Sequence, residues 1–377
     1  MMRRLVAALW VCLGACGDNQ PPSPDAMPVA PSFQSAPHVP MPLAIPHAGA
    51  VLSNLHLVTI TYKDYADLVQ VEAFSDMVVG STWYTSVGAE YGLHAGTHAQ
   101  TYQIEQAPAS LTRAQIAAQI KQLITDGSVL PPAATGNQVL YMIYIPPGVA
   151  RDAGLAGVRG YHDVLTLDAM PMLAGVQVPI AVVLDDGRGL EVTTRTAAHQ
   201  LIDAATDPYH LPMDGYYADP PMTDPWSLIR SEIADLCDGE APILEAGFAL
   251  PRVYSNHAAQ ARKSPCTPFV PDDTWSDVSA VPSTMQVVPP GGSVTFKLTG
   301  WSTREVPDWK LSTQVSDHSE LTLDEMSPRF SSDMINNGVS VTLTLHAPAH
   351  ATSGTPGGVY VLSGENVRPW AVGFLVE

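Results

Sequence analysis

The hydrophobic pattern of the chain changes near residue 275, and this change limits the folds that the chain can adopt. Upstream of it, apolar runs such as "QVLYMIYIPPG" (138–148) and "VPIAVVLDDG" (178–187) read as buried strands. The run "LHLVTITY" (55–62) alternates apolar and polar residues and predicts a further strand. An amphipathic helix is predicted at "SLTRAQIAAQIKQLITDG" (110–127). Strands that alternate with helices are typical of an α/β core.

Downstream of the change, apolar residues recur at every second position between Gly and Pro turns. Examples are "GGSVTFKLTGW" (291–301) and "GVSVTLTLHAP" (338–348), and this stretch has no convincing helical pattern. Period-two strands of this kind predict a small β-sandwich. The sequence therefore predicts two domains, an α/β (α+β) domain over residues 49–270 and an all-β sandwich over residues 275–377.

The first 16 residues have the features of an export signal. Two arginines at positions 3 and 4 precede an apolar run that is too short to span a bilayer, and the run ends in Leu-Gly-Ala-Cys. This ending predicts a lipoprotein signal over residues 1–16, with Cys16 carrying the lipid. The alternative is an ordinary signal peptide with a chance cysteine. We expect a lipid-anchored protein of the cell envelope that faces the periplasm or the exterior, with the Pro-rich residues 17–48 as a linker.

The formal charge of −19 restricts the partners of the chain. Such an acidic protein is repelled by nucleic acid and by anionic membrane surfaces, so we expect no nucleic-acid partner and a membrane contact only through the lipid. The cysteines Cys237 and Cys266 remain after the signal region, and in an oxidising compartment such a pair predicts a disulfide. Two buried free thiols are the alternative.

The segment "TAAHQLIDAATDP" (196–208) contains the first candidate metal ligands. Residues four apart lie on one face of a helix, so His199 and Asp203 point the same way. An imidazole and a carboxylate are a common ligand pair for zinc. Pro208 ends the helix. A solvated or ion-paired His–Asp couple without metal is the alternative.

Further candidate ligands lie on both sides of this helix. Glu232 and Asp235, in "WSLIRSEIADLCDGE" (226–240), are three residues apart and would share the face of a returning helix. Upstream, "RGYHDV" (159–164) offers His162. An exposed acidic helix face is the alternative explanation for the two carboxylates.

Several of these motifs occur in a fixed order that resembles a known family. The order includes "EYGLHAGT" (90–97), "GYHDV" (160–164), "AAHQLIDAATDP" (197–208), "SEIADLC" (231–237) and "VYSNHAAQARKSPCTP" (253–268). It resembles secreted bacterial proteins, many of them lipoproteins, that carry a zincin-like core with an H-E-x-x-E…T-D-P…E-I-G-D-L-C pattern. A more distant similarity is to the plant exordium-like, phosphate-induced proteins. The resemblance implies a zincin-like core followed by an Ig-like sandwich, and zinc as the metal.

The chain departs from that pattern at the position that matters most for hydrolysis. Gln200 stands where the family has the Glu that acts as general base, and Asp203 stands where it has the second Glu. A Gln cannot accept a proton at neutral pH, and loss of a general base costs on the order of 10²–10⁴ in rate. The resemblance therefore implies a degenerate catalytic position at Gln200 in a scaffold that retains metal ligands.

Three functions are compatible with these observations. The first is a surface-tethered lipoprotein whose degenerate metalloprotease-like domain binds metal and an extracellular peptide or other ligand. The second is an active metallohydrolase, most simply a peptidase, with another carboxylate as base. The third is a structural envelope protein without metal.

Overall fold

The computed structural model describes residues 33–38, 40–47, 49–167, 175–209, 215–218, 231–269, 274–316, 319–364 and 368–377. The predicted signal, the lipidation site Cys16 and residues 17–32 of the predicted linker lie outside these ranges. Every helix in the described part of the chain is too short or too polar to traverse a bilayer.

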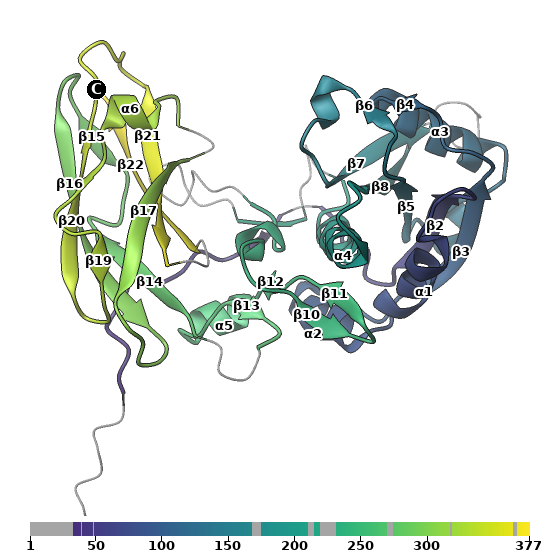
Figure 1. The fold of residues 1–377 in the computed structure, drawn as a ribbon, viewed down its shortest axis with the longest axis horizontal. Helices are drawn as coiled ribbons and strands as arrows, with labels where there is room; N and C mark the ends of the chain where they lie inside the picture. Colours follow the sequence, from purple (N-terminus) through teal and green to yellow (C-terminus); the bar gives the residue numbers. More distant parts are fainter. Residues whose placement is uncertain are drawn as a thin grey trace, which may run out of the picture. The chain divides into compact units, whose positions relative to one another are not determined.

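A five-stranded mixed sheet forms the centre of the N-terminal half (Figure 1). Its spatial order is β3-β2-β5-β8-β7, in which the first four strands are parallel and the edge strand β7 is antiparallel to β8. The strands are β2 (His56–Tyr62), β3 (Thr97–Ile104), β5 (Val139–Ile145), β7 (Gly160–Leu167) and β8 (Val176–Leu184). A parallel sheet with a single antiparallel edge strand is a common arrangement in α/β proteins.

Both faces of this sheet are buried, which explains the continuous apolar runs in its strands. In β5, Leu140, Met142 and Tyr144 join one hydrophobic core, while the residues between them join a second core on the opposite face. The strand predicted at residues 55–62 is confirmed as β2, and its polar positions after His56 are buried together with its apolar ones. Thr59 and Thr61 of β2 are fully buried, because helices cover both sides of the sheet.

Helices from different parts of the sequence cover the two faces. Helix α3 (Arg113–Thr125) lies in one core, and α1 (Leu68–Val78), α2 (Thr82–Gly88) and α4 (Leu190–Thr206) lie in the other. A capping box starts α3, with Thr112 and Gln115 bonded to each other's backbone amides. Residues 110–111, which the sequence assigns to this helix, instead form a short strand, β4 (Ser110–Leu111), which pairs with β6 (Ala150–Arg151).

The predicted linker extends too far toward the folded part. Ala44 is fully buried, and Asn256 receives a hydrogen bond from its amide and donates one to its carbonyl. Next to it, β1 (Ile45–Pro46) pairs with β9 (Tyr216–Tyr217). Backbone groups held in this way belong to the folded body, so a solvated linker does not reach residue 44.

A run of short elements follows the described residues 215–218. They are η5 (Asp235–Cys237), β10 (Ile243–Glu245), β11 (Phe248–Leu250), β12 (Val253–Tyr254), α5 (Asn256–Gln260) and β13 (Cys266–Thr267). The 3-10 helices η1 (Ala89–Tyr91), η2 (Pro132–Thr135) and η3 (Ala153–Leu155) lie earlier in the chain.

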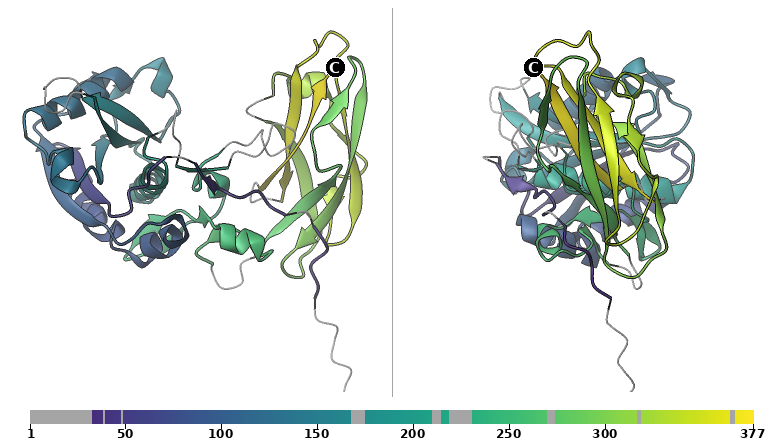
Figure 2. Two further views of the ribbon diagram at one scale, coloured as in Figure 1. Left: turned by 180° about the vertical axis from the view of Figure 1, so that it is seen from behind. Right: turned by 90° about the vertical axis from the view of Figure 1, so that its left-hand side faces the viewer.

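The C-terminal hundred residues form two sheets around one hydrophobic core (Figure 2, right). The first sheet has the order β14-β16-β20-β18 and the second β15-β22-β21-β17-β19. Their strands are β14 (Ser276–Val281), β15 (Gln286–Val288), β16 (Ser293–Ser302), β17 (Trp309–Val315), β18 (Arg329–Phe330), β19 (Met334–Ile335), β20 (Ser340–His346), β21 (Pro356–Ser363) and β22 (Arg368–Val376). The single short helix described here is α6 (Leu323–Met326). The alternating patterns at residues 291–301 and 338–348 are confirmed as the paired strands β16 and β20.

Candidate metal centre

Helix α4 carries the central residues of the candidate site and packs against β7 and β8 (Figure 1). Its 17 residues begin after Gly189, whose φ of +102° favours glycine. Four of its buried residues are alanines, whose small side chains allow the helix backbone to approach its neighbours closely. The helix ends at Asp207, whose buried carboxylate accepts a hydrogen bond from Gly215 N at 2.8 Å. The Thr-Asp-Pro motif therefore ends the helix and anchors the returning chain.

His199 and Asp203 lie one turn apart on α4 and are in contact, as the spacing predicts. The distance from His199 Nε2 to Asp203 Oδ2 is 3.1 Å. Asp203 is 1% exposed, and its other oxygen, Oδ1, accepts a hydrogen bond from Ala234 N at 2.9 Å. Asp203 thus faces His199 with one oxygen and holds the turn of residue 234 with the other.

Asp235 reaches the same histidine from a different element. Its Oδ1 lies 3.1 Å from His199 Nε2, so the imidazole nitrogen sits between two carboxylates. Asp235 begins the 3-10 helix η5, whereas the sequence predicts a returning helix there. Residues 226–230 of the predicted helix lie outside the described residues. A turn at residues 233–234 interrupts the helical pattern, because Ala234 N is bonded to Asp203.

Glu232 contacts another of the predicted ligands, His162. Both oxygens of Glu232 lie 2.9 Å from His162 Nε2, the edge-strand histidine of β7. His162 and Glu232 are both largely buried. The five predicted ligands therefore divide into the cluster His199, Asp203 and Asp235 and the neighbouring pair His162–Glu232.

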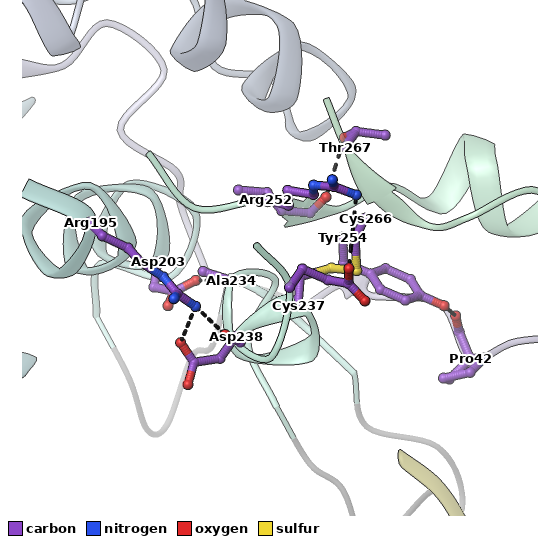
Figure 3. Close-up of a disulfide and its surroundings, with 12 residues drawn as sticks. Pro42, Arg195, Asp203, Ala234, Cys237, Asp238, Arg252, Tyr254, Cys266 and Thr267 are labelled. Atoms are coloured by element: carbon purple, nitrogen blue, oxygen red, sulfur yellow. Dashed lines mark hydrogen bonds and ion pairs between the residues drawn. A yellow bond between two sulfur atoms is a disulfide. The ribbon is translucent and has the colours of Figure 1, made fainter. Parts of the chain in front are cut away.

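The predicted disulfide Cys237–Cys266 is present and holds the turn that carries Asp235 (Figure 3). Both cysteines are buried, Cys237 at the end of η5 and Cys266 in β13. On the solvent side of the same turn, Arg195 of α4 bonds the backbone oxygen of Asp238 and lies 3.3 Å from its carboxylate (Figure 3). The turn is therefore fixed to α4 and to the following strands.

The charges in the cluster shift one another's pKa values. Burial disfavours a charged His199, but Asp203 and Asp235 outweigh this effect and hold the pKa of the imidazole well above 6.5. Burial raises the pKa of Asp203 to about 6, against the opposing effect of His199. Burial also acts to raise the pKa of Asp235, but the hydrogen bond from His199 keeps that pKa below its ordinary value. Without a metal, a proton on His199 is the cation that the two carboxylates share.

The proton on His199 Nε2 cannot form good hydrogen bonds to both carboxylates at once. A single Nε2–H donates well along one direction, and the aligned hydrogen bond goes to Asp235. Asp203 Oδ2 is buried and has no aligned hydrogen bond among the described residues. A buried carboxylate oxygen in this state favours a cation. One ligand atom from each of His199, Asp203 and Asp235 lies within 4.8 Å of the others, so the cluster could hold a metal ion.

Gln200 lies beside the cluster on the next position of α4. Its side-chain amide is 9% exposed, and its Oε1 has no hydrogen-bond partner among the described residues. Gly160, the first residue of β7, passes directly over it. A Cβ at position 160 would lie 3.0 Å from Gln200 Cγ and 2.7 Å from Thr196 Cγ2. The glycine therefore allows the edge strand to approach α4 at the site.

A cavity of about 560 Å³ opens next to the cluster. His199, Gln200 and Asp235 line its inner wall. Its other charged lining residues are Arg159, Glu191, Arg195 and Asp238. Asp238 and Arg195 could not be identified from the sequence, because neither belongs to a recognisable ligand spacing. The backbone amide of Ala234 carries no sequence signal at all.

Comparison with protein-family models finds no match to this chain. A search of curated proteins likewise finds no match.

Proposed function

We propose that the protein is a lipoprotein of the cell envelope whose zincin-like domain binds zinc and an extracellular peptide or other ligand, without efficient hydrolysis. We propose further that the C-terminal sandwich that follows this domain is Ig-like. The observation that carries the metal-binding part is the cluster of His199, Asp203 and Asp235, with a buried and incompletely bonded carboxylate oxygen facing the imidazole.

The spacing of the cluster supports zinc. Atoms bound at about 2.0–2.1 Å to a tetrahedral zinc are separated from one another by about 3.3 Å. The two contacts of His199 Nε2, with Asp203 Oδ2 and Asp235 Oδ1, are both 3.1 Å. Small side-chain rotations would bring these separations to the expected value. Three protein ligands leave a fourth position for water or for a ligand from the cavity.

Gln200 supports binding rather than hydrolysis. When zinc is bound, it lowers the pKa of a coordinated water, but hydrolysis also needs a group that accepts the proton of the water. The neutral amide of Gln200 can accept a hydrogen bond and cannot take up a proton at neutral pH. Its buried position beside His199 is that of a residue which orients a bound group.

A second candidate function is hydrolysis with a substitute base, and one observation favours it. The carboxylate of Asp238 lines the same cavity and lies 3.9 Å from His199 Nδ1. Arg195 already contacts this carboxylate at 3.3 Å, so the contact would have to open before Asp238 could accept a proton from a bound water.

Metal analysis of purified wild type and three variants tests the proposal. We expect wild type to bind one zinc, His199→Ala to lose it, and Gln200→Ala to retain it, because Gln200 is not a ligand. The matched control is His98→Ala, which breaks another His–Asp contact, with Asp76, far along the sequence from the cluster. Wild type that binds no zinc after dialysis against it would exclude the metal-binding function and favour the structural alternative.

Gln200→Glu tests whether the catalytic position is degenerate. If the proposal is correct, this substitution restores a proton acceptor and raises peptide hydrolysis about tenfold or more, equivalent to a barrier lowered by at least roughly 1.4 kcal/mol. The assay is hydrolysis of a mixed peptide library with and without chelator. Chelator-sensitive hydrolysis by wild type that Gln200→Glu does not increase would favour the substitute base, and Asp238→Asn would then abolish it.

A further inference from the structure

We propose that the cavity beside the cluster receives the C-terminal carboxylate of a peptide and that Arg159 recognises it. This inference rests on the proposed function, because it names the ligand class of the same site. It is carried by the position of Arg159 in the cavity wall and by its charge environment.

Arg159 is the exposed cation at the wall formed by the start of β7. Its backbone carbonyl accepts a hydrogen bond from Leu184 N at 2.7 Å, which fixes the base of the side chain to the sheet. Its neighbours along the cavity wall, Gly157 and Gly160, have no side chains.

The guanidinium of Arg159 has capacity for a ligand. Its side chain is 54% exposed, and its Nε lies 4.0 Å from Asp186 Oδ2, which is longer than a hydrogen bond. Asp186 is already bonded by Arg188, whose Nε lies 2.6 Å from the same oxygen. The planar fork of an arginine matches a carboxylate with two parallel hydrogen bonds.

The second arginine of the cavity is engaged differently. Arg195 bonds both the backbone oxygen and the carboxylate of Asp238 through Nη2, and its side chain is 29% exposed, so it offers less free surface to a ligand than Arg159. The cavity also contains the carboxylates of Glu191 and Asp235. This surplus of negative charge disfavours a doubly charged phosphate more than a singly charged carboxylate.

Gln200 also lines the cavity, but its Oε1 is buried and closed to solvent, and therefore to a ligand in the cavity. Recognition of the carboxylate is thus assigned to Arg159 alone.

The test compares short peptides that differ only at the C-terminus. N-acetylated tripeptides with randomised residues are prepared as free acids and as C-terminal amides, and their binding to the zinc-loaded full chain is measured by affinity selection and mass spectrometry. We expect the acids to bind about tenfold or more tightly than the amides, because the amide loses a charge-assisted pair. Arg159→Gln should remove this preference and leave zinc content unchanged. Arg329→Gln, which removes an exposed positive charge from β18, is the matched control and should keep it.

Several outcomes would overturn the inference. They are equal binding of acids and amides by wild type, no binding of either set, retention of the preference in Arg159→Gln, or stronger competition by inorganic phosphate than by acetate. The comparison is repeated on chelator-treated protein. Loss of zinc binding with a retained acid preference would refute the metal site alone, whereas zinc binding without the preference would refute the role of Arg159 alone.

Discussion

Removal of the Cys237–Cys266 disulfide should weaken both the fold and the candidate metal site. The bond joins residues 29 apart in sequence, and the loop-entropy relation gives a stabilisation of about 3.6 kcal/mol for a loop of this length. Such a loss is a large fraction of the roughly 5–15 kcal/mol that stabilises an ordinary folded protein. Both cysteines are buried, so their replacement by alanine also removes packing contacts. This loss adds to the destabilisation that comes from the open loop.

The effect on the metal site follows from the position of the bond. Cys237 is two residues beyond Asp235, and the same turn supplies the amide that holds Asp203. When the turn gains freedom, the ligands are less well oriented, and losses of supporting contacts around metal sites typically weaken binding by about tenfold or more. We therefore expect the double variant Cys237→Ala/Cys266→Ala to bind zinc about tenfold more weakly than wild type.

Urea unfolding and zinc titration measure the two effects separately. Unfolding by urea and by heat is followed by tryptophan fluorescence at equal chelator concentration, and in the thermal experiment the Tm should fall by roughly 7 °C, at about 2 °C per kcal/mol for a chain of this size. Zinc affinity is measured well below that temperature, where the variant is folded. A variant within about 1 kcal/mol of wild type would refute the loop-entropy argument. Unchanged zinc affinity in a clearly destabilised variant would show that the disulfide does not position Asp235.

Three further predictions follow from the site and from the N-terminus. Zinc affinity should rise from pH 5 to above pH 7, by about tenfold per pH unit for each displaced proton. The reason is that the pKa values of His199 and of Asp203 (about 6) are raised, so protons compete with zinc for these ligands up to neutral pH. A calorimetric titration in which the affinity is already constant at pH 6 would contradict this prediction. Gly160→Ala should lower the free energy of unfolding by about 1–3 kcal/mol and displace Gln200, since the new Cβ would lie 3.0 Å from Gln200 Cγ. A variant as stable to urea as wild type would count against the close approach of β7 to α4. Cys16→Ser should shift the protein out of the detergent phase in a partitioning experiment, and equal partitioning would remove the lipid anchor from the proposal.

The regular elements of the N-terminal half could be predicted from the sequence because each satisfies its own local pattern. The continuous apolar run of β5 requires burial on both faces, and the spacing of His199 and Asp203 places them on one helical face whatever surrounds the helix. The disulfide was predictable because only two cysteines follow the predicted export signal, and such a signal leads to an oxidising compartment. These inferences need only information within a few turns of chain or the count of one residue type.

The arrangement around the turn of residues 231–238 could not be predicted in the same way. Glu232 and Asp235 have helical spacing, but a backbone amide between them is bonded to a carboxylate 31 residues away, and this contact breaks the helical pattern. Glu232 then meets His162, 70 residues away along the chain. The folded position of Ala44 could not be predicted for a similar reason, because its proline-rich surroundings give no sign of the two hydrogen bonds that it forms with Asn256, one as donor and one as acceptor.

The two oxygens of Asp203 link the binding of a cation in the cluster to the hydrogen bond of one backbone amide, that of Ala234. Oδ1 accepts from Ala234 N while Oδ2 faces His199, so a cation held by Oδ2 restrains the carboxylate that covers this amide. Opening of the turn would have to release the cation as well, and its free energy therefore increases with cation concentration. The hydrogen exchange of the Ala234 amide should therefore slow as the cation concentration rises. Its rate reports whether the site is occupied, without any peptide, substrate or substitution.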